Sequence, residues 1–298
     1  MTAHPQPRQT TLARAATLGG IGVHSGAPAQ LTLHPAPAGE GLCFVDSCGR
    51  TIPALWRHGE RVALRTQLRR GAARLSTVEH VLAALAGLGV DNALIEIEGA
   101  EAPALDGSAA PIGRAILDAG ITTLAAPRRR IEILKTVRAE TAEGFAELSP
   151  GAGLSLDVAI DFAHPAIGAQ RIVWRPDPGT FMRDIAPARS FGFLADVEAL
   201  WRTGLARGAG LDNTLAFDAR GPVNPEGVRF PDECVRHKAL DALGDLALAG
   251  APIEGTFRSL RGGHALNLAV LQALFADSSA WRWSWGRAAA APETRVAL

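Results

Sequence analysis

The sequence predicts an α+β fold in two domains, and three observations support this prediction. The chain has 298 residues, and a compact domain typically holds about 150. Strand-like segments dominate both halves, and only a few helical segments accompany them, unlike the regular alternation of a doubly wound sheet. The pattern restarts after residues 121–130, where Ala125-Ala126-Pro127 and three arginines indicate a linker. We therefore expect an N-terminal domain at 1–126 and a C-terminal domain at 127–298.

The N-terminal half is expected to combine four strands with two helices. Four glycines between Gly19 and Gly26 indicate a tight turn. A helix that ends at Gly89 is expected because apolar residues recur at helical spacing, namely Val78, Val81, Leu82, Leu85 and Leu88. The expected strands are 10–18, 29–34, 42–45 and 93–98, and the second helix is 111–119.

The C-terminal half is expected to contain a long helix at about 234–248. Its apolar side would consist of Val235, Leu240, Leu243 and Leu246, and Gly250 would end it. Strands are expected at 131–138, 144–149, 154–161, 213–217 and 256–260, and further helices at 194–201 and 265–276. Near the end of the chain, Trp281, Trp283 and Trp285 alternate, which indicates packing rather than a binding surface.

The composition excludes several classes of function. Lys+Arg and Asp+Glu both total 30, so the formal net charge is zero, which argues against a nucleic-acid partner. Cys43, Cys48 and Cys234 fit neither a disulfide framework nor a metal knuckle, and free thiols are expected. Neither a secretory signal nor an apolar run of about 18 residues is visible. We expect a cytoplasmic monomer without stable membrane insertion.

The expected helix at 234–248 carries a pattern that suits a metal ion. His237 and Asp241 are four residues apart, and Asp245 follows four residues later. On a helix such residues lie one turn apart on the same face, so an imidazole and a carboxylate point at one spot. The alternative is a solvated pair on a surface helix, and this segment alone does not decide between the two.

Three further polar residues would complete a catalytic set. Glu79 precedes His80, and His264 follows two glycines. Zinc ligated by His80, His237 and Asp241 would leave Glu79 free as a general base and His264 as a general acid. The alternative for Glu79 is a capping box with Ser76. Because three coincidences are needed, spacing alone leaves both interpretations open.

Several longer blocks occur in the order of a known enzyme family. They are GIGVHSG at 20–26, STVEHVLAALAGLGVDNALIEIEG at 76–99, PALDGSAAP at 103–111, DFAHPAIG at 161–168, DIAPARSFGF at 184–193, NPEGVRFPDECVRHKALDALGDLALAG at 224–250 and RGGHALN at 261–267. With these blocks the chain, from Gln9 to Asp277, strongly resembles the bacterial UDP-3-O-acyl-N-acetylglucosamine deacetylases, the zinc enzymes committed to lipid A synthesis.

The resemblance implies two domains of similar α+β topology with the active site at their interface. It implies Zn²⁺ bound by His80, His237 and Asp241. Glu79 would take a proton from the attacking water, and the Ser190 hydroxyl would stabilise the oxyanion. His264 would protonate the leaving amine while Asp245 orients its ring. The implied reaction hydrolyses the acetamide of UDP-3-O-(3-hydroxyacyl)-N-acetylglucosamine.

The resemblance also implies a set of substrate contacts. Lys238 would meet the UDP phosphates or the sugar, Phe162 would stack on uracil, and Phe191 would form a wall near the glucosamine. His24 would line the site. The 3-O-acyl chain would pass through an apolar passage in an insert at about 194–214, where Val197, Ala206 and Ala209 are small or apolar. The alternative is that these three residues are the ordinary core of a small subdomain.

The chain departs from the family pattern at three positions. Ser190 stands where Thr is usual, and the hydroxyl is kept. Gly144 stands where a basic residue is frequent, so a phosphate contact is missing or is supplied elsewhere, for example by Arg138. Cys234 replaces a larger apolar residue beside the zinc ligands.

Fe²⁺ could replace Zn²⁺ with these ligands.

Two other functions stay open on the sequence alone. The first is another zinc amidase or peptidase with the same ligands, which would hydrolyse an acetamide without a nucleotide. The second is a non-catalytic α+β binding protein, such as an RNA-binding module with a structural zinc.

Overall fold

The computed structural model describes residues 7–285 and shows runs of strands interrupted by single helices. The α+β prediction is confirmed. The first strand, β1 (Arg8–Leu12), pairs antiparallel with β10 (Ile121–Pro127). The segment expected as a linker is therefore extended and hydrogen-bonded to the start of the chain.

The other strands of the N-terminal half form two sheets. The five-stranded sheet has the order β2-β3-β9-β4-β5 and the three-stranded sheet the order β6-β7-β8. The strands are β2 (Ala16–Ile21), β3 (Pro28–Pro35), β4 (Leu42–Asp46), β5 (Thr51–Pro53), β6 (Gly59–Glu60), β7 (Gln67–Arg70), β8 (Ala73–Ser76) and β9 (Ala93–Glu98). The helices are η1 (Trp56–His58), α1 (Glu79–Gly87) and α2 (Ala110–Ala119).

The C-terminal half is built on one seven-stranded sheet. Its main path is β12-β13-β18-β11-β19, and β14 pairs with both β15 and β18. The strands are β11 (Arg130–Ile133), β12 (Val137–Glu140), β13 (Phe145–Ser149), β14 (Leu154–Asp161), β15 (Ala169–Trp174), β18 (Ile253–Leu260) and β19 (Trp281–Ser284). The helices of this half are α3 (Pro178–Asp184), α5 (Glu233–Ala247) and α6 (His264–Ala276), of which α3 packs against α1 and α2.

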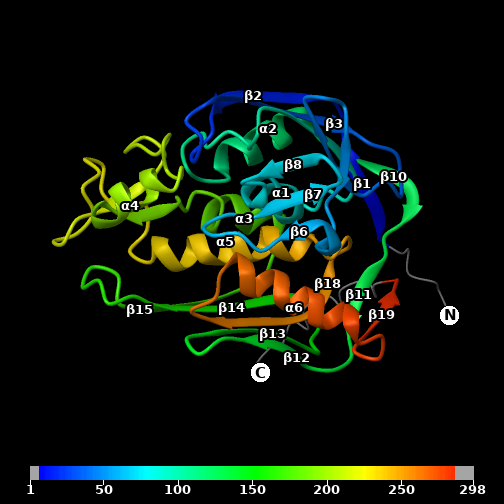
Figure 1. The fold of residues 1–298 in the computed structure, drawn as a ribbon. Coiled ribbons are helices and arrows are strands. Elements are labelled where there is room, and N and C mark those ends of the chain that lie inside the picture. The colour runs from blue at the N-terminus through cyan, green and yellow to red at the C-terminus, as the bar shows by residue number, and fades with distance from the viewer. Residues whose placement is uncertain (1–6, 286–298) are drawn as a thin grey trace, which may run out of the picture.

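A small projecting part interrupts the C-terminal half. It contains β16 (Phe191–Phe193), η2 (Leu194–Asp196), α4 (Val197–Arg202) and β17 (Leu215–Phe217), with β16 and β17 paired in parallel. Figure 1 shows this part at the side of the molecule, beyond one end of α5. The projection includes the segment expected to form the acyl passage.

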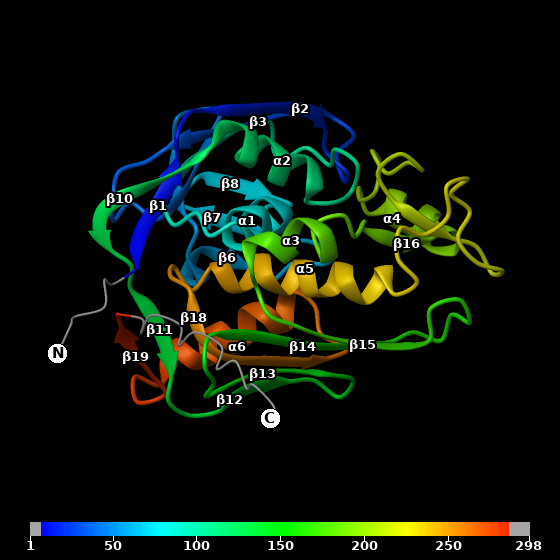
Figure 2. The same ribbon diagram turned by 180° about the vertical axis from the view of Figure 1, so that it is seen from behind.

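Helix α5 runs through the middle of the molecule. Figures 1 and 2 show it between the N-terminal sheets with α1 and α2 on one side and the large sheet with α6 on the other. It is buried along most of its length, and its buried residues include the polar Glu233, His237, Asp241 and Asp245 as well as its leucines. Such polar groups are costly to bury without partners, so their presence inside α5 indicates a site built around them.

Strand pairing divides the described chain into two groups. Strands β1–β10 pair only among themselves, and β11–β19 do the same across the region that the structure describes. We propose a boundary at 126/127, with similar domains at 1–126 and 127–298, although Pro127, the last residue of β10, still pairs with Arg8 of the N-terminal group. Residues 1–6 and 286–298 of these ranges lie outside the described residues.

Most element predictions are confirmed, and the errors share a cause. The expected strand 10–18 is wrong, because β1 pairs with β10 while β2 pairs with β3. The strand 131–138 is likewise two strands, and Gly19–Ile21 continues β2 rather than forming a turn. Long-range pairing decides these boundaries, whereas the sequence pattern reports only local preference. The elements that were not predicted are β5, β6, β7, β8, β15, β16, β19, η1 and α3, and β10 was expected as a linker.

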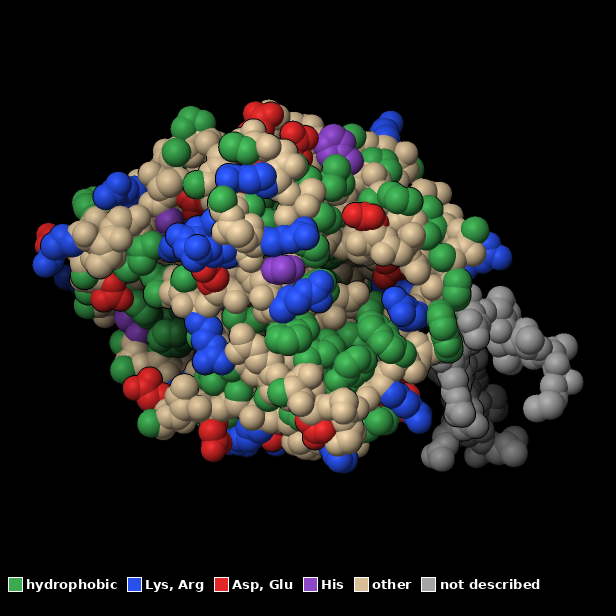
Figure 3. All heavy atoms as spheres, turned by 45° about the vertical axis from the view of Figure 1, so that its right-hand side comes forward, with side chains coloured by type: hydrophobic (Ala, Val, Ile, Leu, Met, Phe, Trp, Pro, Cys, Tyr) green, Lys and Arg blue, Asp and Glu red, His purple; other side chains and the backbone are tan. Residues whose placement is uncertain are grey.

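The cysteines are free thiols, as the composition predicted, and the charges are unevenly distributed on one face of the surface. Cys43, Cys48 and Cys234 are free. Within residues 7–285, no helix combines the length and the apolar character needed to cross a lipid bilayer. Figure 3 shows basic side chains and a histidine gathered near the centre of one face, beside a hydrophobic patch. The balanced charges of the chain are thus unevenly distributed on this face.

Candidate metal centre and active site

Three side chains from two helices converge beside the middle of α5. His237 and Asp241 lie one turn apart on α5, and His80 comes from α1. Asp241 Oδ1 is 3.3 Å from His237 Nε2 and 3.6 Å from His80 Nε2. The ligand atoms of all three lie within 4.8 Å of one another. This spacing is compatible with one metal ion bound by all three.

The surroundings of these side chains fit a metal better than a simple ion pair. His237 Nδ1 donates to the backbone oxygen of Ala188 at 3.1 Å, which leaves Nε2 with a free lone pair. Burial lowers the pKa of His237 to about 3, so its ring is neutral at pH 7. Asp241 Oδ1 is buried, and no hydrogen-bond partner for it occurs in the described part of the chain. Two imidazoles and a carboxylate oxygen are a donor set that suits zinc.

The helix crossing that brings His80 to His237 and Asp241 depends on a glycine. Helices α1 and α5 pack so closely that a Cβ at Gly244 would lie 2.1 Å from the backbone oxygen of Glu79. Any larger residue would have to push the two helices apart. Gly244 therefore allows His80 to approach His237 and Asp241.

Glu79 is buried at the start of α1, and its carboxylate does not cap the helix. Glu79 Oε2 accepts a hydrogen bond from the backbone N–H of Thr66 at 3.0 Å. The capping-box alternative is wrong, because Val78 is the N-cap residue and Ser76 Oγ donates to Gln67 Oε1 instead. Burial raises the pKa of Glu79 above its usual range. A carboxylate held in this way is poised to accept a proton.

His264 and Asp245 form a second charged pair beside the ligands. His264 Nδ1 is 2.8 Å from Asp245 Oδ2, and His264 Nε2 is 3.9 Å from Asp241 Oδ2. Burial would lower the pKa of His264, but the carboxylates of Asp245 and Asp241 outweigh it and raise this pKa to about 9. The ring is therefore an imidazolium at neutral pH and can donate a proton from Nε2.

Thr66 connects these two groups, although no sequence pattern singled it out. Besides its N–H bond to Glu79, its hydroxyl donates to Asp245 Oδ1 and lies 3.1 Å from His264 Nδ1. Asn267 Nδ2 also donates to Asp245 Oδ2 at 2.8 Å. Asn267 lies within the matching block 261–267, so the sequence could have identified it as a site residue. Thr66 lies in an arginine-rich stretch without a motif that would identify it.

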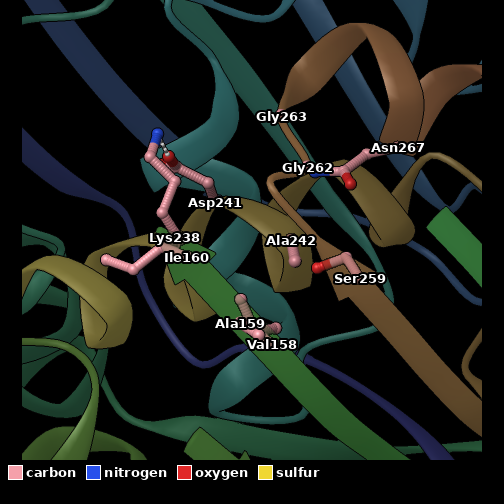
Figure 4. A pocket seen from close by; sticks show the side chains of 10 residues that line it. All are labelled: Val158, Ala159, Ile160, Lys238, Asp241, Ala242, Ser259, Gly262, Gly263 and Asn267. Carbon is pink, nitrogen blue, oxygen red and sulfur yellow. Dashed lines mark hydrogen bonds and ion pairs between the residues drawn. The ribbon is translucent and has the colours of Figure 1, made fainter. Parts of the chain in front are cut away.

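Two hollows flank the converging residues. One is lined by His80, Thr77, Gly107, Ser190 and Asn213, among others. The other, shown in Figure 4, is lined by Lys238 and Asp241 of α5 together with residues of β14, β18 and α6. Lys238 Nζ donates to Asp241 Oδ2 at 2.7 Å in this hollow. One hollow thus reaches His80 and the other reaches Asp241.

Comparison with known proteins identifies the family. Residues 9–276 match the family described as UDP-3-O-acyl N-acetylglycosamine deacetylase. Proteins named UDP-3-O-acyl-N-acetylglucosamine deacetylase from Brucella ovis and Brucella canis are each 47% identical over 277 residues. The protein of that name from Brucella melitensis has the same identity, and each alignment covers 92% of this chain and 97% of the relative. The chain belongs to the UDP-3-O-acyl N-acetylglycosamine deacetylase family.

The aromatic residues expected to contact the substrate lie together near the trio His80, His237 and Asp241. The rings of Phe162 and Phe191 meet edge to face with centroids 5.5 Å apart, and Phe191 is 6.1 Å from the His237 ring. Lys238 Nζ lies 5.6 Å from the Phe191 ring. The structure thus brings Phe162, Phe191 and Lys238 to one end of α5.

His24 lies on the loop between β2 and β3, and this loop contacts the insert in the C-terminal half of the deacetylase. Its Nδ1 accepts from the N–H of Ala206 at 3.4 Å, and its backbone oxygen accepts from Arg207 at 3.1 Å. On the other side, the buried Glu101 carboxylate accepts hydrogen bonds from the backbone N–H of Ser25 at 2.7 Å and from Thr77 Oγ1 at 2.9 Å. Glu101 was not singled out from the sequence, although it clamps this loop.

The insert at 194–214 has an open structure. Val197 and Ala206 are half-buried and Ala209 is exposed, and none of residues 194–212 is buried. The alternative that these residues form the core of a small subdomain is therefore wrong. Whether Val197, Ala206 and Ala209 line an acyl passage stays a prediction, and the two hollows described above do not include them.

The departures from the family pattern have local structural consequences. A Cβ at Gly144 would lie 2.4 Å from the backbone oxygen of Leu260, so this backbone has no room for a basic side chain there. Arg138 is engaged by Glu140 and Glu147 and stacks on Phe145. Cys234 is buried, and burial raises the pKa of its thiol to about 12, so it is unreactive.

Proposed function

We propose that this chain hydrolyses the acetamide of UDP-3-O-(3-hydroxyacyl)-N-acetylglucosamine to the free amine and acetate, the committed step of lipid A biosynthesis. The observation that carries the proposal is the trio of the half-buried His80 with the buried His237 and Asp241, with a carboxylate and an imidazolium beside it. Membership of the deacetylase family supports the same reaction.

Zinc is the metal that we assign to His80, His237 and Asp241. A zinc ion would supply Lewis acidity, which lowers the pKa of water from about 15.7 toward about 7 and polarises a carbonyl group. The unpartnered Oδ1 of Asp241 and the free Nε2 of His237 support this assignment.

The proton transfers are assigned to two residues beside the trio, both of which contact Thr66. Glu79 takes a proton from the attacking water, and the Thr66 N–H holds its carboxylate in place. His264 gives a proton to the leaving amine from Nε2. Asp245 holds the Nδ1 side of the His264 ring, and Asn267 donates in turn to Asp245. The hydroxyl of Ser190, beside His80 in one hollow, donates to the oxyanion.

Each part of the substrate is assigned to residues around the trio. Phe162 stacks on the uracil, Phe191 lines the glucosamine, Lys238 contacts the phosphates or sugar, and His24 lines the site on the side of the insert. The acyl chain follows Val197, Ala206 and Ala209. The contacts between the Phe162, Phe191 and His237 rings and the bond from Ala206 to His24 support this arrangement. The cytoplasmic location and the monomeric state stay predictions.

Metal removal tests the reaction and the cofactor together. We expect the metal-stripped protein to leave UDP-3-O-acyl-N-acetylglucosamine intact and one equivalent of Zn²⁺ to restore deacetylation, measured as acetate release. A zinc-bound protein that deacetylates only acetamides without a nucleotide would contradict the substrate and favour another zinc amidase. Equal activity before and after stripping would contradict the metal assignment.

Larger side chains in the insert should change the preferred acyl length. We expect Ala206→Leu and Ala209→Leu to favour shorter acyl chains, because each adds three carbons where the chain is assigned. The measurement is kcat/KM across substrates of increasing chain length, with Ala219→Leu, exposed outside the insert, as the matched control. An unaltered chain-length profile in both variants would remove the passage assignment.

A further inference from the structure

An arginine lies completely buried between the site and the start of α5. Arg189 and Glu233 are each 1% exposed. Arg189 Nε donates to Glu233 Oε1 at 2.8 Å, Nη2 donates to Oε2 at 3.2 Å, and the backbone N–H of Arg189 donates to Oε1 at 3.0 Å. Arg189 also bonds the carboxylate of Glu226 and the backbone oxygen of Gly227. The guanidinium is thus held in one orientation by several partners.

Both chain neighbours of Arg189 serve the site. The backbone oxygen of Ala188 accepts the hydrogen bond from His237 Nδ1. Ser190 lines the hollow beside His80, and its N–H is fixed by Gly107 O at 2.7 Å. Residues 188–190 therefore present a carbonyl that orients one imidazole, an anchoring guanidinium and the hydroxyl assigned to the oxyanion.

The partner of Arg189 belongs to the same helix as two of the proposed metal ligands. Glu233 begins α5 and lies four residues, or one turn, before His237. The Arg189–Glu233 pair therefore fastens residues 188–190 to the helix whose side chains those residues orient. In contrast, the nearby pair Arg236–Asp232 is partly exposed and has no contact with Ala188 or Ser190 among the described residues.

Stability alone gives no reason for such a pair. Taking two charges out of water costs several kcal/mol per ion, and replacing a buried pair by apolar residues of similar volume is often neutral or stabilising. Removing one partner, however, leaves an uncompensated charge and is strongly destabilising. The benefit of this pair must therefore be sought in the geometry that it imposes.

We propose that Arg189 and Glu233 are positioning residues that hold the Ala188 carbonyl against His237 and the Ser190 hydroxyl at the site. The pair sets the His237 ring for metal binding, and its effect on turnover rests on the function proposed above. It touches neither substrate nor metal, and it acts through residues 188 and 190.

A double variant separates positioning from stability. We expect Arg189→Met and Glu233→Leu to lower the melting temperature when made singly, and the double variant Arg189→Met/Glu233→Leu to be more stable than either, although the backbone N–H groups of Arg189 and Arg229 still lose their acceptor. The double variant should nevertheless bind Zn²⁺ about 10- to 100-fold more weakly, measured by competition with a chelator, because the bond that orients a ligand is loosened. Its kcat should fall more than its KM rises. The matched control is Arg236→Met/Asp232→Asn, which should keep zinc affinity.

A spectroscopic measurement makes the test independent of turnover. We expect the ¹⁵N NMR signal of the His237 ring to show a hydrogen-bonded Nδ1–H in the wild type and to lose it in the double variant. A double variant more stable than either single variant, with unchanged zinc affinity and an unchanged His237 signal, would overturn the proposal. If the wild type binds zinc but releases no acetate, the proposed function fails, and the affinity and NMR results still decide the positioning role.

Discussion

Glu79→Gln is expected to lower kcat for deacetylation by about 10²- to 10⁴-fold, the usual contribution of a positioned general base. Glutamine has nearly the volume of glutamate, and its amide oxygen can still accept the Thr66 N–H, so the helix start should be preserved. It cannot accept the proton of the attacking water. The measurement is steady-state acetate release, with metal content and melting temperature determined on the same sample.

The control for this variant is a carboxylate outside the site. Glu254→Gln removes a partner of Arg130 at the start of β18 and should leave kcat unchanged. Wild-type turnover in Glu79→Gln with zinc bound would exclude Glu79 as the base. Loss of zinc in this variant would instead assign Glu79 a part in metal binding.

Gly244→Ala is expected to reduce both the free energy of unfolding and the activity. Alanine favours a helix by about 1 kcal/mol over glycine, which alone would stabilise α5. Its Cβ, however, would lie 2.1 Å from the oxygen and 2.9 Å from the carbon of the Glu79 carbonyl, and these backbone atoms cannot rotate away. The clash should dominate, because forcing an extra methyl into a packed core costs about 1–3 kcal/mol.

The same clash should open the proposed metal site. Helix α1 carries Glu79 and His80, whereas α5 carries His237 and Asp241, so separating the helices moves the two halves of the site apart. A displacement of about 1 Å can cost about 10²-fold in turnover. We expect weaker zinc binding, measured by chelator competition, and lower kcat.

A glycine with free space around its Cα provides the control for this variant. A Cβ added at Gly19 would meet no atom of the described residues within 4 Å, and the backbone there has a conformation that alanine adopts. Gly19→Ala should therefore be near neutral. Wild-type zinc affinity in Gly244→Ala would show that the α1–α5 distance does not control the site.

Local patterns in the sequence predicted many of the elements and part of the site. The apolar spacing of Val235, Leu240 and Leu243 predicted α5, and the four-residue interval between His237 and Asp241 placed both on one face of it. Such predictions succeed because helix geometry relates residues three and four apart, whatever the rest of the chain does. The resemblance of longer blocks supplied His80, Glu79 and His264.

The tertiary structure alone decided how distant segments meet, both within each half and between the two halves. The approach of α1 to α5 at Gly244, the bonds of Thr66 to Glu79 and Asp245, and the Arg189–Glu233 pair join residues far apart in the chain. The same holds for β1, which leaves β2 to pair with β10. These contacts follow from the packing of whole elements against one another, so no short stretch of sequence contains the information that fixes them.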